Sequence, residues 1–256
     1  MKNVITLITD FGTKDHYAGV MKGVILGINP DAVIVDITHE IEKYNIFEAA
    51  FKLRNYYGCF PHGTVHVAVV DPGVGGPRRP IAIEAGGYFF VGPDNGIFSP
   101  ALGCLDSPVA IEITRSRYML KDVSATFHGR DIFAPAAAHI SSGVGIRELG
   151  DKAPEPVKLE IPQPSVYGNE ISGEVLYADS FGNLITNIPG KAVGTGSRIY
   201  AGRHGIDGVS GAYGEAEKGE LVAIIGSSGL LEISVNQGSA RELMRGKRIS
   251  VRVVTE

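Results

Sequence analysis

The sequence is poor in cysteine, and this shortage excludes two kinds of protein. It contains only Cys59 and Cys104, which form no CxxC pair and have no Cys/His spacing typical of a structural zinc site. Two cysteines in a chain of this length also provide no disulfide framework. We therefore expect two reduced thiols, a cytoplasmic location and no metal centre.

Long hydrophobic runs and basic clusters are lacking as well. The first apolar run, Val4–Thr9, ends at Asp10, so it is too short for a signal peptide or a membrane span. The formal net charge is −4, and no cluster of Lys and Arg forms a nucleic-acid footprint. We expect neither a membrane nor a nucleic acid as partner, and a small molecule as ligand.

The first part of the chain alternates strand-like and helix-like segments. Continuous apolar runs at 4–9, 32–37 and 64–70 are typical of strands buried on both faces. Helix-compatible spacing separates them, at 17–27 and 46–56. This order predicts an α/β domain with a mainly parallel sheet. A hairpin is expected at 81–84 and 88–91, around Gly86-Gly87, and a helix at 132–140.

The composition changes beyond this domain. Four prolines between residues 151 and 169 indicate a linker. Short apolar runs then follow, separated by glycine-rich turns, which favours a small all-β barrel. We therefore predict an N-terminal domain over 1–153, a linker over 154–169 and a C-terminal β-barrel over 170–256.

Three carboxylates are predicted at strand ends, where open α/β sheets bind ligands. Asp10 and Asp71 follow the first and third strands, and Asp36 closes the second. Any one of them is better explained as a helix cap or turn former, but three together favour a site. The glycine-rich loop after Asp71 is neither GxGxxG nor a P-loop. It is better explained as a turn that brings Asp71 and Arg78 to one cavity.

Other polar clusters have both a structural and a functional explanation. His128, beside Arg130 and Asp131, is placed to polarise water. His66 and His139 lie within apolar runs and are expected to be structural. In the second domain, the segments 179–183 and 226–229 offer ligand groups but are equally explained as hairpin turns.

The whole chain resembles the S-adenosyl-L-methionine hydroxide adenosyltransferases, relatives of the fluorinase and chlorinase enzymes. The resemblance is carried by ITLITDFGTKDHYAGVMKG, VDITHEI, VVDPGVGGPRRPIAIE, FVGPDNGIFSP, TFHGRDIFAPAAAHI, DSFGNLITNI and IGSSGLLEISVNQG. It implies a Rossmann-like domain followed by a β-barrel, in a homotrimer whose sites lie at subunit interfaces. It also implies that activated water splits S-adenosyl-L-methionine into adenosine and L-methionine.

The resemblance assigns roles residue by residue. Asp71, Arg78 and His128 match the catalytic set of the water-using branch. The substrate-binding residues that it implies are Asp10 for the ribose, Tyr44 and Phe127 around the ligand, Asp179 and Ser227 for the methionine, and Phe181 and Asn183 for the adenine. Methionine leaves as a neutral thioether, so the reaction requires no general acid, metal or cofactor. His128 or Asp71 is expected to accept the proton of the water, because arginine does not readily act as a base.

Departures from the halogenases leave alternatives open. Gly129 replaces a serine that helps to hold fluoride, and leaves room for a larger ion such as chloride. Ser228 and Ile185 replace an arginine and a tryptophan, which changes the expected methionine and adenine contacts. The rivals are therefore a chloride-using adenosyl transferase and a non-catalytic S-adenosyl-methionine or adenosine sensor. A Rossmann dehydrogenase is disfavoured because GxGxxG is absent.

Overall fold

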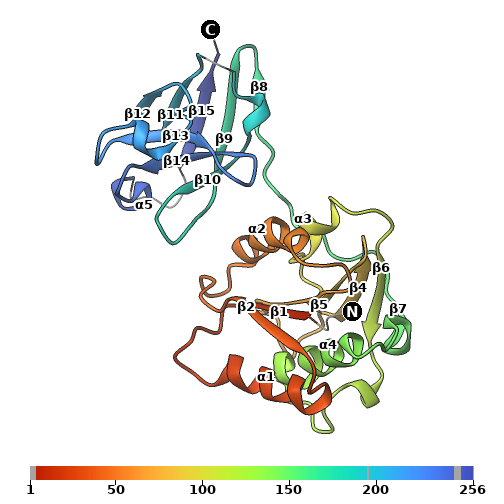
Figure 1. The fold of residues 1–256 in the computed structure, drawn as a ribbon. Helices are drawn as coiled ribbons and strands as arrows, with labels where there is room; N and C mark the ends of the chain where they lie inside the picture. The colour runs from red at the N-terminus through yellow and green to blue at the C-terminus, as the bar shows by residue number, and fades with distance from the viewer. Residues whose placement is uncertain (1–3, 195, 245–248, 256) are drawn as a thin grey trace. The chain divides into compact units, whose positions relative to one another are not determined.

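The protein consists of two compact units, divided between Leu159 and Glu160. The computed structural model describes residues 4–194, 196–244 and 249–255 (Figure 1). Residues 154–169, which were predicted to link the domains, are shared between the two units. The backbone N–H of Val157 donates to Asp94 Oδ1 at 2.8 Å in the first unit, whereas Ser165–Tyr167 forms a strand of the second.

The first unit is built on a seven-stranded sheet. Its strand order is β2 (Val33–Thr38), β1 (Val4–Thr9), β3 (Val65–Val69), β5 (Tyr88–Pro93), β4 (Pro80–Ala85), β6 (Val109–Ile113) and β7 (Gly150–Lys152). The pairs β1–β2, β1–β3 and β3–β5 are parallel, while β4 pairs antiparallel with β5 and β6, and β6 with β7. The α/β class is therefore confirmed, but the sheet is mixed. The predicted hairpin accounts for the reversal, because Gly86 and Gly87 adopt φ values of +56° and +81° in a tight turn.

Helices cover both faces of this sheet (Figure 1). On one face α1 (Tyr17–Ile28) and α4 (Ala134–Ser141) pack against β1 and β3, with Met21 and Leu7 fully buried. On the other face lie α2 (Ile46–Tyr56) and the short α3 (Ser99–Leu102). Helix α2 has the bounds that its sequence predicts, since the Asn45 side chain caps it by accepting from Glu48 N at 3.0 Å. These layers leave the carboxyl ends of β1 and β3 open to a ligand.

Strand β2 differs from its prediction. The apolar run at 32–37 was expected to be buried on both faces, but Val33 is 48% exposed within this chain. The reason is its place at the edge of the sheet, where it pairs only with β1 among the described strands. A continuous apolar run therefore predicted the strand correctly but not its burial.

The helix predicted at 132–140 begins with an irregular turn. Gly129–Phe133 forms a single π-helical turn, η3, which continues directly into α4. Such turns are rare and occur often at functional sites. This one carries the residues that follow His128.

The second unit is an antiparallel sheet that nearly closes on itself. Its order is β12 (His204–Asp207), β11 (Arg198–Ala201), β15 (Ser250–Val254), β9 (Glu170–Ala178), β10 (Leu184–Pro189), β14 (Leu230–Val235) and β13 (Leu221–Ile225), with β8 (Ser165–Tyr167) also paired to β9. Ser210, just after β12, bridges to Ile224 of β13 and draws the two ends of this order together. Ile188, Leu231 and Val251 fill its interior. The barrel-like antiparallel character of this unit is confirmed, but the unit also contains one short helix, α5 (Ala240–Leu243), after β14.

Candidate functional site

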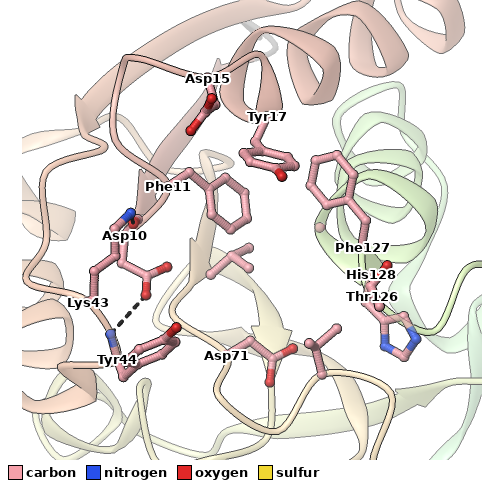
Figure 2. A pocket seen from close by; sticks show the side chains of 13 residues that line it. Asp10, Phe11, Asp15, Tyr17, Lys43, Tyr44, Asp71, Thr126, Phe127 and His128 are labelled. Carbon is pink, nitrogen blue, oxygen red and sulfur yellow. Dashed lines mark hydrogen bonds between the residues drawn. The ribbon is translucent and has the colours of Figure 1, made fainter.

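The first unit has a hollow of about 260 Å³ at the carboxyl ends of β1 and β3 (Figure 2). Asp10 follows β1 directly, and Asp71 follows β3 after Val70. Both therefore reach the edge at which α/β sheets bind ligands. The lining residues are Asp10, Phe11, Asp15, Tyr17, Lys43, Tyr44, Val69, Asp71, Val74, Thr126, Phe127, His128 and Gly129.

Asp10 is held in the wall of this hollow by the segment that precedes α2. Its Oδ2 accepts a hydrogen bond from the backbone N–H of Tyr44 at 2.9 Å, and its backbone carbonyl accepts from the Lys43 ammonium. Tyr44 has a φ of +66°, which is unusual for a residue with a side chain, and its ring is 70% exposed. Asp10 itself is only 7% exposed. The structure thus presents a buried carboxylate beside an exposed aromatic ring.

Asp71, Arg78 and His128 form one hydrogen-bonded chain. Arg78 Nε donates to both oxygens of Asp71 at 3.0 Å, and Arg78 Nη2 donates to Asp71 Oδ2 at 2.5 Å. The same Nη2 lies 2.7 Å from His128 Nδ1. Asp71 and His128 line the hollow, whereas Arg78 is not among its lining residues and its side chain is 10% exposed. The arginine therefore lies behind the two groups that face a ligand.

This contact determines which nitrogen of His128 carries a proton. A guanidinium has no acceptor, so Arg78 must be the donor and Nδ1 the acceptor. The neutral ring then carries its proton on Nε2. Burial lowers the pKa of His128 below its usual value, and the positive charge of Arg78 lowers it further, although Asp71 and Asp131 act in the opposite direction. His128 is thus a neutral donor through Nε2.

Phe11, Tyr17 and Phe127 form an aromatic wall of the hollow (Figure 2). The ring of Phe127 lies edge-on to Phe11 at 5.8 Å and to Tyr17 at 5.2 Å between centroids. The Arg130 guanidinium lies 5.2 Å from the centre of the Phe127 ring and pairs with the fully buried Asp131. These contacts fix the segment that carries His128 and give the hollow an apolar face.

Gly129 lines the hollow, and neighbouring side chains surround the direction that a β-carbon would take. A β-carbon at this position would lie 3.3 Å from both Met21 Sδ and Phe11 Cζ, and 3.4 Å from Phe127 Cε2. These distances are tighter than ordinary van der Waals contact, so the neighbouring side chains already occupy the space of a larger residue. The prediction that Gly129 leaves room for a larger ion in the hollow is not tested by these contacts and stays a prediction.

Comparison with known proteins identifies the group to which this geometry belongs. The model of the SAM hydroxide adenosyltransferase N-terminal domain matches residues 5–150, and that of the C-terminal domain matches residues 173–249. The chain belongs to the SAM hydroxide adenosyltransferase family. The resemblance inferred from the sequence is therefore confirmed.

Several relatives are similar over nearly the whole chain. Proteins named (R)-S-adenosyl-L-methionine hydrolase from Thermus thermophilus and Methanocaldococcus jannaschii are 40% and 39% identical, over 94% of this chain and 94% and 92% of their own. A fluorinase from Nocardia brasiliensis is 26% identical, over 92% of this chain and 91% of its own. An uncharacterized conserved protein from Thermotoga maritima has a TM-score of 0.90 at 37% identity, covering 98% of this chain and all of that chain.

In this adenosyltransferase-family chain, the second unit keeps its predicted ligand residues in two turns. Asp179 Oδ1 accepts from the backbone N–H groups of Phe181 and Asn183, both at 2.9 Å, and Oδ2 accepts from Asn183 Nδ2 at 2.9 Å. Phe181 is 78% exposed. Ser227 is exposed in the turn between β13 and β14. Both segments are hairpin turns, as the structural interpretation held, and both present polar or aromatic groups to solvent.

Asp36 is the predicted strand-end carboxylate that does not join the site. It lies inside β2, contacts the Lys22 ammonium, and its Oδ1 is 3.1 Å from His39 Nε2. Burial would raise the pKa of Asp36, but its contacts with the Lys22 ammonium and the His39 ring outweigh burial and hold the pKa below its usual value. Within the described residues, no cluster of three or more His, Cys, Asp and Glu side chains is arranged to hold a metal ion.

The two histidines expected to be structural lie away from the hollow. His66 is fully buried, and burial lowers its pKa to about 3. His139 packs edge-on against Tyr118 at 5.1 Å. Seven lining residues were not predicted from the sequence, although all but Lys43 lie in the motifs quoted above: Phe11, Asp15, Tyr17, Lys43, Val69, Val74 and Thr126.

Proposed function

We propose that this protein is an enzyme that hydrolyses S-adenosyl-L-methionine to adenosine and L-methionine. One observation carries the proposal: Asp71 and His128, joined through Arg78, face the same hollow as the buried Asp10. Membership of the SAM hydroxide adenosyltransferase family and the printed names of the relatives support it. Because these names specify the (R) form, we propose that the (R) configuration at the sulfonium sulfur is the preferred one.

In this proposal Asp10 holds the ribose hydroxyls, since a carboxylate can accept two hydrogen bonds at once. Asp71 and His128 hold one water in line with the bond from sulfur to the ribose 5′ carbon. Arg78 is a positioning residue that fixes both of them from behind. Holding a nucleophile in a near-attack position can contribute roughly 7–11 kcal/mol to lowering the barrier.

The reaction requires one bond to form and one to break. The water oxygen attacks the 5′ carbon, and the electron pair of the carbon–sulfur bond leaves on sulfur, which makes methionine a neutral thioether. His128 donates through Nε2 to the water oxygen and so orients it, which leaves Asp71 as the proton acceptor of the two groups considered. A carboxylate suffices as the base, because the attacking water becomes strongly acidic once it bonds to carbon. The proposed chemistry uses no metal and no cofactor.

We also propose the architecture that the family resemblance implies. The strand–helix–strand half of the first unit, around β1, β2 and β3, would act as a Rossmann-like nucleoside-binding layer. Asp179 and Ser227 would bind the methionine part, Phe181 and Asn183 the adenine, with Tyr44 and Phe127 around the ligand. In a cytoplasmic homotrimer, these second-unit residues would come from a neighbouring subunit. Light scattering that shows a fully active monomer would refute the trimer.

Product analysis in isotopically labelled water tests the reaction. The label should appear in the adenosine 5′-hydroxyl, and the (R) epimer of the substrate should turn over faster than the (S) epimer. A 5′-chloro product in the presence of chloride would show an adenosyl transferase that uses halide. Tight binding without any product would show a sensor. Either result would overturn the hydrolase proposal.

A further inference from the structure

A second chain of polar contacts reaches the site from outside the hollow. It runs from Asp36 through His39 to Thr9, the residue before Asp10. We infer that Thr9 and His39 are positioning residues that orient the Asp10 carboxylate toward a ribose. The inference rests on the proposed function, because it presumes that Asp10 holds the ribose hydroxyls.

The contacts of Thr9 and His39 surround Asp10 along the backbone. Thr9 Oγ1 lies 2.9 Å from His39 Nδ1 and also accepts from the backbone N–H of Phe11 at 3.2 Å. The backbone N–H of Gly12 donates to the His39 carbonyl at 2.6 Å, and Ile41 N donates to the Thr9 carbonyl at 3.3 Å. The residues on both sides of Asp10 are thus tied to the His39–Ile41 segment.

These contacts have a consistent direction in the neutral imidazole. Asp36 Oδ1 lies 3.1 Å from His39 Nε2, at an ion-pair distance but without the alignment of a hydrogen bond, and a negative charge at this place favours the ring proton on Nε2. Nδ1 then accepts from the Thr9 hydroxyl, whose oxygen accepts from Phe11 N–H. His39 is 5% exposed and Thr9 fully buried, so water does not compete for these groups.

The contacts that run from Asp36 through His39 to Thr9 are suited to orienting the Asp10 side chain, which has few other contacts. Asp10 Oδ2 accepts from Tyr44 N, so the direction of the carboxylate depends on where the Asp10 backbone lies relative to Tyr44. A carboxylate grips a diol only when both oxygens are correctly directed, and such a group is held best by neighbours that are themselves fixed. Thr9 and His39 supply this support through the backbone.

The experiment compares adenosine with 2′,3′-dideoxyadenosine, which lacks the hydroxyls that Asp10 would hold. Calorimetry would measure both dissociation constants for the wild-type protein and for Thr9→Val and Thr9→Ser. Thr9→Val keeps the shape of the side chain but removes the hydroxyl, whereas Thr9→Ser keeps the hydroxyl. A second pair covers the histidine: His39→Asn retains an acceptor near the position of Nδ1, and His39→Phe does not.

We expect Thr9→Val and His39→Phe to weaken adenosine binding roughly five- to tenfold, as for one lost hydrogen bond. Binding of the dideoxy compound should change by less than about twofold. Thr9→Ser and His39→Asn should restore adenosine binding, and kcat at saturation should stay within about twofold of the wild type.

Each other outcome identifies what has failed. Equal losses for both compounds would show that Thr9 and His39 support the general shape of the site, which overturns the inference alone. Unchanged binding in all four variants would overturn it as well. If the wild-type protein binds both compounds equally, Asp10 does not grip the ribose hydroxyls. That result overturns the ribose assignment in the proposed function and the inference with it.

Discussion

Asp71 in the first unit is proposed to act on the attacking water and Asp179 in the second on the methionine part of the substrate, and different kinds of contact hold them. Asp71 is fixed by the charge of Arg78, and through it is linked to His128, which lies 50 residues beyond Arg78. Asp179 is fixed within its own turn by two backbone N–H groups and by Asn183. A change at Asp71 therefore breaks a long-range network, while a change at Asp179 leaves most of its turn intact.

The two units also differ in their buried histidines. The histidines whose pKa is lowered by burial, His66, His128 and His139, all belong to the first unit. Removing a buried or paired polar group lowers the stability of the site more than removing an exposed one, because its hydrogen-bond partners are left unsatisfied. We therefore expect the largest effects on turnover and on acid stability in the first unit, and selective effects on ligand binding in the second.

The largest effect is expected for Asp71→Asn. An amide can neither neutralise Arg78 nor accept the proton of the attacking water, so kcat should fall by about 10²–10⁴-fold. KM should change little, because the group acts on the water and not on the substrate. Steady-state kinetics at one pH would measure both constants. The matched control is Asp106→Asn, which alters an exposed aspartate of the same unit.

A pair of further variants tests whether the catalytic set acts as a unit. Arg78→Ala and His128→Ala combined should lower kcat little more than the worse single change, since Arg78 acts through His128 and Asp71 on the water that they hold. Additive losses would mean that the two residues act independently. Normal kcat with a raised KM in each single variant would make them substrate-binding residues.

The next largest effect is expected for Asp10→Ala. Loss of a charged hydrogen-bond acceptor should weaken adenosine binding by about 10–100-fold, which corresponds to roughly 1.5–3 kcal/mol. Calorimetry with adenosine measures this directly, because adenosine carries the ribose but no methionine. Asp106→Ala is the control. An unchanged dissociation constant would remove Asp10 from the ribose site.

The sequence predicts the parts of this site that depend on local patterns. Apolar runs that end at Asp10 and beside Asp71 place both carboxylates at the ends of parallel strands, and the structure brings them to one hollow. The capping of α2 by the Asn45 side chain similarly makes the start of this helix predictable from the sequence. In each case residues only a few positions apart determine the structure.

The remaining features depend on contacts between distant residues. Asp36 was grouped with the strand-end carboxylates, but β2 continues to Thr38, since its pairing with β1 resumes at Ile8 and Thr38 after a register shift. The sequence gives no sign of this shift. The spacing of these residues in the sequence also does not show that Arg78 lies behind Asp71 and His128. Their proximity depends on η3, which follows His128, and on the β4–β5 hairpin, which follows Arg78. The extent of the antiparallel part of the sheet escaped prediction as well, because β6 and β7, which pair antiparallel with β4 and with each other, were not predicted.

A smaller effect concerns acid stability of the first unit. Burial lowers the pKa of His66 to about 3 in the folded protein, against about 6.5 when it is exposed. Above pH 6.5 the ring is neutral in both states, so its full contribution is present. As the pH falls from about 6.5 toward 3, only the unfolded state gains the proton, and stability falls. Between pH 7 and pH 5 the loss should be roughly 2 kcal/mol at most.

Substitution of His66 isolates this contribution from those of other histidines. Hydrogen exchange of the β3 amides at the two pH values reports the stability of the first unit. His66→Phe should reduce its pH dependence, whereas His16→Phe, at an exposed position, should not. A variant whose stability falls as steeply as that of the wild type would show that other groups cause the acid sensitivity.

The smallest effect on the fold, and the most selective on binding, is expected for Asp179→Asn. The amide oxygen can still accept from Phe181 N and Asn183 N, so the turn should persist with a loss of roughly 0.5–1.5 kcal/mol for the bond to Asn183 Nδ2. The negative charge is lost, so affinity for S-adenosyl-L-methionine should fall about tenfold while adenosine affinity changes by less than about twofold. Calorimetry in an Asp71→Asn background allows the substrate to be titrated with little turnover. Equal losses of affinity for both ligands would mean that Asp179 shapes the adenine contacts of Phe181 and Asn183. Asp71 and Asp179 would then no longer differ as a residue for turnover and a residue for binding of the methionine part.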